Sequence, residues 1–281
     1  VTSFDTDGFT LGSVNGDWNL TGRTYVAWAW DMGGDSYGLP VSLTANGGAQ
    51  HSTSQNKIGS SSMYFDGSGD YLTASHSSLA LGDDFTVECW VRPNNNSGNN
   101  TVFSNNWGVG TDILLTYSHP SHGTGKFGLF ALGDTRITGT TVHALGTWHH
   151  VALVRSGGII TLYINGLSEG TYASSTTLTN TNVIIGGVYT SGVQTWNGYM
   201  DEFRISNEAR YNANFTPSTT AFSNDVNTLF LLHSDTSNGS TTFVDSSGAD
   251  KNTNGSITSY VAANPTYGQS IVSWTGTGAT G

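Results

Sequence analysis

Two adjacent carboxylates, Asp201 and Glu202, stand inside the otherwise apolar stretch MDEFRIS of residues 200–206. Neighbouring acids can transfer protons in hydrolysis, hold calcium, or complete the hydrogen bonding of a sheet. The stretch has the composition of a β-strand, in which successive side chains point to opposite faces. We therefore predict that Asp201 lies at the margin of the core, on the face of Phe203 and Ile205, and that Glu202 lies on the opposite face.

This alternation argues against a catalytic acid pair. Glycoside hydrolysis needs two carboxyl groups that flank the same bond, and neighbours in a regular strand cannot do so. Glu88 is the only acid of the predicted strand 85–93, and no nucleophile elbow or Ser-His-Asp order is evident. We predict no catalytic residue, and we expect a protein that is not an enzyme.

A carboxylate at the margin of a core needs hydrogen-bond donors or a cation, because an unpaired buried charge is very costly. Two alternatives are open for Asp201. Backbone N–H groups of a neighbouring loop can satisfy it, or it can ligate a structural Ca²⁺ ion. In the second case Asp66 and Asp70 of the turn FDGSGDY are the expected co-ligands.

Aromatic and amide side chains in predicted loops offer a different chemistry. Aromatic rings can stack on sugar rings, and amides can bind sugar hydroxyls. The alternative for each aromatic is that it covers a sheet edge, or, for Trp90 on the face of Glu88, that it packs under a loop. The predicted carbohydrate-binding residues are Trp107, Trp196, Asn105, Asn106, Tyr117, Tyr189, Gln194 and Trp90.

The composition supports a folded β protein and excludes several partners. The 281 residues include 37 glycines, 36% hydrophobic residues and only 10% charged residues. A net charge of -11 with nine Lys and Arg gives no basic footprint for nucleic acid. No apolar run approaches membrane-spanning length, so no membrane insertion is expected. The single cysteine, Cys89, excludes an intrachain disulfide and alternates with core residues.

Two-residue alternation, bounded by Gly, Asn, Asp and Ser, recurs along the chain, and helical periodicity is nearly absent. We predict an all-β fold of two antiparallel sheets packed face to face. The turn 66–70 is expected to form a hairpin, and we expect Glu88 to pair with Arg204 across neighbouring strands. The predicted strands are 62–65, 71–74, 85–93, 126–132, 148–155, 159–166, 183–188 and 198–206.

Five motifs resemble the laminin-G-like, concanavalin A-like jelly-roll family. FDGSGDYL, FTVECWV, WHHVA, LYING and GYMDEFRI occur in the family's order within residues 38–222. The resemblance implies a two-sheet jelly-roll sandwich, and a calcium ion at a strand-end margin is frequent in the family.

Segments outside these motifs resemble modules of bacteriophage tail and fibre proteins. These segments are 227–248 and the flanks 2–31 and 252–278. We therefore predict a flanking β segment at 1–35, the jelly-roll domain at 38–248, and a second flanking β segment at 249–281. The flanks are expected to pair with neighbouring modules or with copies of the chain, because exposed strand edges must be covered.

The function expected from these features is a structural and adhesive module of a phage tail fibre or virion surface. Its expected partners are host-surface carbohydrate and other virion proteins or copies of itself. A purely structural spacer or decoration protein, and a secreted bacterial adhesin, are the alternatives. The expected location is the virion surface or the extracellular space, with structural Ca²⁺ as the one cofactor considered.

Overall fold

A computed structural model describes residues 3–5, 8–10, 41–105, 113–188 and 194–249. The chain divides into two compact units, Val1–Ser36 and Tyr37–Gly281. In the first unit, β1 (Ser3–Asp5) pairs antiparallel with β2 (Gly8–Thr10). The predicted domain limits at 35, 38 and 248 stay predictions, and the predicted C-terminal flank lies outside the described residues except for Ala249.

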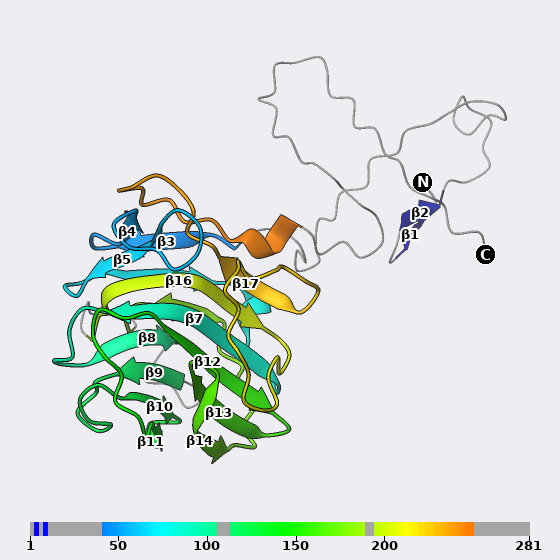
Figure 1. Ribbon diagram of the computed structural model, residues 1–281. Helices are drawn as coiled ribbons and strands as arrows, with labels where there is room; N and C mark the ends of the chain where they lie inside the picture. Colours follow the sequence, from blue (N-terminus) through cyan, green and yellow to red (C-terminus); the bar gives the residue numbers. More distant parts are fainter. Residues whose placement is uncertain (1–2, 6–7, 11–40, 106–112, 189–193, 250–281) are drawn as a thin grey trace, which may run out of the picture. The chain divides into compact units, whose positions relative to one another are not determined.

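The second unit consists of two antiparallel sheets, which confirms the predicted fold class (Figure 1). The first sheet has the order β11 (Asp134–Thr138), β10 (Phe127–Ala131), β9 (Ile113–Tyr117), β8 (Asn100–Ser104), β15 (Asn182–Ile185), β6 (Tyr71–Ser75) and β3 (Leu43–Asn46). The second has the order β14 (Leu167–Ala173), β13 (Ile159–Ile164), β12 (His149–Ser156), β7 (Phe85–Pro93), β16 (Asn197–Ser206), β5 (Ser62–Asp66) and β4 (Gln50–Ser52), with β17 (Thr228–Leu232) also paired to β16. The helical elements among the described residues are the short 3-10 turns η1 (Ser77–Leu79) and η2 (Ser246–Ala249), and none is long and apolar enough to cross a membrane.

The core lies between the two sheets, and β7 shows how the sequence builds it. Phe85, Val87, Cys89 and Val91 all belong to the main apolar cluster and are at most 1% exposed, as their alternation predicts. The same burial raises the pKa of the Cys89 thiol, because a thiolate would be desolvated there. Cys89 is therefore a core side chain.

Glycine turns connect several strands, and one of them differs from its prediction. Asn165 and Gly166 join β13 to β14 with positive φ angles of 51° and 79°, as a tight hairpin requires. The turn at 66–70 is not a hairpin, because β5 and β6 belong to different sheets. Its glycines turn the chain from one layer of the sandwich to the other.

A β-bulge interrupts β16 at Glu202, whose φ is +52°. Asp201 lies opposite Trp90 and Arg204 lies opposite Glu88, so two residues of β16 face one of β7. Before the bulge the other edge of β16 pairs with β5, and after it with β17. The regular alternation predicted across residues 198–206 is therefore wrong. Met200 and Phe203 both enter the core, and Asp201 lies on the opposite face.

A segment without regular structure, residues 207–222, covers the outer face of the second sheet; we call it the strap. Its residues Tyr211 and Phe215 pack on Val154 and Tyr163 of that face. The Phe215 N–H donates to the Gly166 carbonyl at 2.9 Å. Because the strap lies over this face, side chains that point away from the core are nevertheless buried.

Candidate functional site

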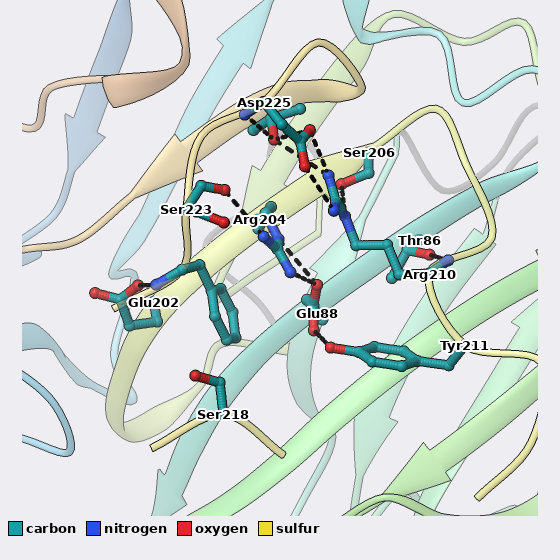
Figure 2. Close-up of polar contacts among 12 residues, drawn as sticks. Thr86, Glu88, Glu202, Arg204, Ser206, Arg210, Tyr211, Ser218, Ser223 and Asp225 are labelled. Atoms are coloured by element: carbon teal, nitrogen blue, oxygen red, sulfur yellow. Dashed lines mark hydrogen bonds and ion pairs between the residues drawn. The ribbon is translucent and has the colours of Figure 1, made fainter. Parts of the chain in front are cut away.

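Glu88 is the centre of a buried polar cluster under the strap (Figure 2). Arg204 donates from Nε and Nη2 to Glu88 Oε1 at 2.9 and 2.6 Å, which confirms the predicted cross-strand pair. The Tyr211 hydroxyl donates to Oε2 at 2.8 Å, and His150 Nε2 lies 3.2 Å from the same oxygen. Burial alone would raise the pKa of Glu88, but His150 and Arg204 hold it below its ordinary value.

Asp201 and Glu202 also point into protein rather than solvent, and both are 0% exposed. Asp201 Oδ2 accepts the N–H groups of Lys57 and Ile58 at 2.8 and 3.0 Å. Glu202 accepts the Phe222 N–H at 2.6 Å and contacts His233 Nδ1 at 2.9 Å. The two acids therefore bind separate loops at the point where β16 changes its edge partner. The backbone hydrogen bonds considered for Asp201 are present, although the residue lies on the face opposite to the predicted one.

The environment of Asp201 predicts a pH-dependent stability. Burial, with a further contribution from the charges of Glu202 and Asp235, raises the pKa of Asp201 to about 7, although two backbone N–H groups oppose the shift. Between the ordinary value of 3.8 and about 7, folding takes up a proton. Stability from this group is therefore complete at low pH and is lost as pH rises through about 7. Urea unfolding should show a loss of about 2 kcal/mol between about pH 5 and pH 7.

Asp201→Asn should flatten this part of the pH profile, since an amide does not titrate. A later decline should remain, because the hydrogen bond to Glu202 raises the pKa of His233 above 6.5, and its contribution is lost at still higher pH. The exposed Asp134, replaced by Asn, serves as the control and should leave the profile unchanged. An unaltered slope in Asp201→Asn would show that this carboxyl is ionised throughout.

The predicted calcium ligands are occupied by hydrogen bonds within the protein. Asp70 accepts the N–H groups of Gly48 and Asp66, the latter at 2.9 Å, and Asp66 accepts the Ser68 N–H at 2.6 Å. No group of three His, Cys, Asp or Glu side chains in the described parts of the chain is arranged to hold a metal ion. The donor set of Asp201, Asp66 and Asp70 thus does not fit Ca²⁺, and bound calcium stays a prediction that the structure leaves untested.

Four of the predicted sugar-binding residues occupy other surroundings than expected. Trp196 and Tyr117 are 0% exposed, and Tyr117 belongs to β9 rather than to a loop. Trp90 is 6% exposed and packs with Phe222, so it follows the alternative of packing under a loop. Asn105 is buried, and its Oδ1 accepts the Ile113 N–H at 2.6 Å. None of these four presents a free surface to a sugar.

Gln194 differs, because it lines a pocket of about 580 Å³. Trp107, Asn106 and Tyr189 lie outside the described residues. We call this cavity the amide-lined pocket. Its lining residues are Gly67, Asn95, Ser97, Gly98, Asn99, Asn100, Gln194, Thr195 and Asn197.

Three segments position the amide-lined pocket. The loop after β7 is tied to the start of β16 by the Asn94 N–H, which donates to the Asn197 carbonyl at 2.9 Å. The Asn197 side-chain amide donates to the Asp66 carbonyl at 2.7 Å. Gly67 is needed beside it, because a Cβ there would lie 2.6 Å from Asn197 Nδ2. The pocket is thus built on the ends of β7, β5 and β16.

Of the residues that line the pocket, only Gln194 was predicted from the sequence. The run NNNSGNN at 94–100 directly follows Pro93, where β7 ends. A concentration of amides in a short loop after a strand is a usable signal, because amides both donate and accept hydrogen bonds. The amides predicted to bind sugar, Asn105, Asn106 and Gln194, stand beside loop aromatic residues, and only Gln194 belongs to this pocket.

Two side-chain amides of the pocket have an oxygen that makes no hydrogen bond to the described residues. Asn95 Oδ1 and Gln194 Oε1 are buried, and within the described ranges they have no hydrogen-bond partner. The other amides that line the pocket include two that are fixed. Asn100 donates to the Ser97 carbonyl at 3.4 Å, and Asn197 is bound to Asp66. Buried polar groups without a partner are uncommon in folded proteins, so these two oxygens mark the pocket as a candidate ligand site.

Known proteins share this architecture. A family profile described as the Concanavalin A-like lectin/glucanases superfamily matches residues 66–214. A crystal structure of a candidate carbohydrate binding protein from Bacteroides ovatus is similar with a TM-score of 0.53 and 17% identity, covering 75% of this chain and 57% of that chain. The chain therefore spans little more than half of that protein.

Two further solved structures show weaker similarity. Domain 4 of the extracellular arabinanase AbnA from Geobacillus stearothermophilus, in complex with arabinotriose, has a TM-score of 0.42 and 17% identity, with 61% and 84% coverage of this chain and of that chain. Tailspike protein 2 of the Escherichia coli O157:H7 bacteriophage CAB120 has a TM-score of 0.44 and 12% identity, with 63% and 27% coverage. No curated protein matches the chain. Because the family profile covers more than half of the chain, including β7, β12, β13 and β16, the protein belongs to the laminin-G-like family of the concanavalin A-like lectin/glucanase superfamily.

Proposed function

We propose that the jelly-roll domain is a non-enzymatic carbohydrate-binding module and that the amide-lined pocket holds the sugar. The observation that carries the proposal is a pair of buried amide oxygens in a pocket of about 580 Å³. They belong to Asn95 and Gln194, and neither has a hydrogen-bond partner among the described residues. This volume falls in the usual range of small-molecule sites, roughly 300–1,000 Å³. The lectin-like fold supports the same assignment.

The chemistry of the lining suits sugar hydroxyls. Each hydroxyl both donates and accepts a hydrogen bond, and each side-chain amide offers a carbonyl acceptor and N–H donors. Five of the lining residues are Asn or Gln. The pocket can therefore satisfy several hydroxyl groups at once, which the aromatic residues predicted from sequence do not do.

The burial of the acids supports the non-enzymatic part of the proposal. Glu88, Asp201 and Glu202 are at most 1% exposed, and each accepts hydrogen bonds from protein donors. No carboxylate of the described part of the chain lines the amide-lined pocket. A pair of carboxyl groups that could flank one glycosidic bond is therefore missing from its lining.

The biological setting that we propose is a tail fibre or surface protein of a phage virion, where the domain attaches to host-surface carbohydrate. The support is the resemblance of the flanking segments, 2–31 and 252–278, to modules of phage fibre proteins. The flanks would then join neighbouring modules or other copies of the chain at the virion surface, outside the cell.

Asn95→Ala and Gln194→Ala test the pocket directly. Each substitution should weaken binding of an array-identified glycan by roughly five- to tenfold, because it removes about one hydrogen bond. Isothermal titration calorimetry measures the dissociation constants. Asn96→Ala is the matched control, because Asn96 is an exposed amide of the same loop and does not line the pocket.

If both variants bind as tightly as the wild type and the control, the sugar is bound elsewhere on the domain. If the wild type binds no glycan at all, the domain is a structural spacer and the proposal fails.

A further inference from the structure

We infer that the amide-lined pocket selects neutral saccharides and binds them directly, without a bridging metal ion. The inference rests on the proposed function and specifies its ligand class. Three observations support it: the lining is uncharged, the neighbouring acids accept hydrogen bonds from backbone N–H groups, and some of the amides are hydrogen-bonded while the oxygens of two others are not.

Among the residues that the structure describes, the lining carries no charged side chain. Arg92 is the basic residue nearest in sequence to the loop of 94–99, and its Nη1 donates to Asn94 Oδ1 at 3.1 Å. A sialic acid, uronic acid or sulfated sugar would lose hydration in the pocket and gain no cation in return, which is costly. The chain's net charge of -11 adds a repulsion at longer range. Neutral sugars meet neither penalty.

The lining residues that the structure describes offer no ligand set for a bridging calcium ion. Ca²⁺ takes six to eight oxygen ligands, usually with carboxylates among them, and the lining offers neutral amide, hydroxyl and backbone groups. The nearest acids in sequence, Asp66 and Asp70, accept N–H groups of the 66–70 turn. The contacts to the sugar therefore come from the protein itself.

The amides of the pocket have two different roles. Asn100 and Asn197 are hydrogen-bonded to backbone carbonyls, so they fix the shape of the pocket. The side-chain oxygens of Asn95 and Gln194 are buried and have no partner among the residues that the structure places, and each amide reaches a ligand by turning about its last torsion, which has a broad energy profile. Each can then present its carbonyl and its N–H to a pair of adjacent hydroxyls. The preferred ligand is a neutral saccharide with two neighbouring free hydroxyl groups.

An array of neutral, sialylated and sulfated glycans tests the inference with the full chain. Wild-type protein is applied once in EDTA and once in millimolar calcium, and the Asn95→Ala, Gln194→Ala and Asn96→Ala variants are applied in EDTA. We expect neutral glycans to bind equally in both buffers, with at least a fivefold loss in the first two variants and none in the third. Methylation of one hydroxyl of the adjacent pair should cause a loss of similar size.

The outcomes separate the two proposals. Binding only to acidic glycans, or binding abolished by EDTA, with the pocket variants still weakened, would leave the proposed function standing and overturn the inference. Binding to no glycan, or binding insensitive to both pocket variants, would overturn the proposed function and the inference with it. An unchanged melting temperature in Asn95→Ala and Gln194→Ala shows that any loss is not caused by unfolding.

Discussion

Glu88→Gln is expected to lower the free energy of unfolding by about 3–5 kcal/mol, the usual cost of breaking a buried ion pair. Arg204 has 7% of its side chain exposed and Glu88 has none. The substitution leaves the Arg204 guanidinium buried without a counter-charge. It also replaces one acceptor oxygen by an N–H₂ group, which donates and does not accept, so either Arg204 or Tyr211 loses its acceptor. Urea unfolding at neutral pH measures the loss.

The matched control is the exposed pair of Asp134 and Arg136, whose Asp134 side chain is 70% exposed and whose nitrogen–oxygen distance is 2.9 Å. Asp134→Asn should change the unfolding free energy by about 1 kcal/mol or less, because solvent screens this pair. A double replacement, Glu88→Leu with Arg204→Met, should be less destabilising than Glu88→Gln, since it removes both charges. If Glu88→Gln behaves like the control, the strap does not exclude water from the cluster.

Much of this cluster could be predicted from sequence, because it depends on regular alternation. Residues 85–93 alternate without interruption, so the core face of β7 and the outward position of Glu88 follow from its two-residue period. The pairing with Arg204 was also predictable. The burial of the pair was not, because it depends on the strap, a segment without periodicity whose position is set by contacts with distant strands.

The position of Asp201 was mispredicted because a bulge is not a local property of the sequence. MDEFRIS contains no glycine to mark it, and Glu202 adopts the left-handed conformation without one. The bulge lies where the edge of β16 changes from β5 to β17, and backbone donors from 57, 58 and 222 fill the gap. One extra residue then moved Asp201 to the opposite face.

The loop position predicted for Trp196 and Tyr117 was wrong for a different reason. Trp196 stands in a polar, glycine-containing stretch, which is typical of an exposed loop, but the chain turns it into the core beside Tyr117. The ring's area favours burial wherever the backbone allows it. The pocket instead joins Gly67 to amides near residues 95 and 194, which are distant in sequence, and the register of β5, β7 and β16 brings these segments together.

Gly166→Ala is expected to lower the free energy of unfolding by about 3 kcal/mol, the second largest effect that we predict. Gly166 has a φ of +79°, where an alanine costs about 1–2 kcal/mol. A Cβ there would also collide with the Phe215 carbonyl and lie 3.1 Å from Pro217 Cδ. Phe215 stacks on Tyr211 with ring centroids 3.5 Å apart, so its displacement would also disturb the hydroxyl that donates to Glu88.

Gly133→Ala separates the two causes of this loss. Gly133 has a φ of +81° in the β10–β11 turn, follows Leu132 at +54°, and would place its Cβ more than 4 Å from any other group. The turn thus repeats the backbone geometry of Asn165-Gly166 without the strap, and its alanine variant should lose only about 1–2 kcal/mol. The difference between the two variants measures how strongly the strap is held on the sheet. Equal losses would mean that the strap moves away at little cost, and Glu88 would then be accessible to water, contrary to the first prediction.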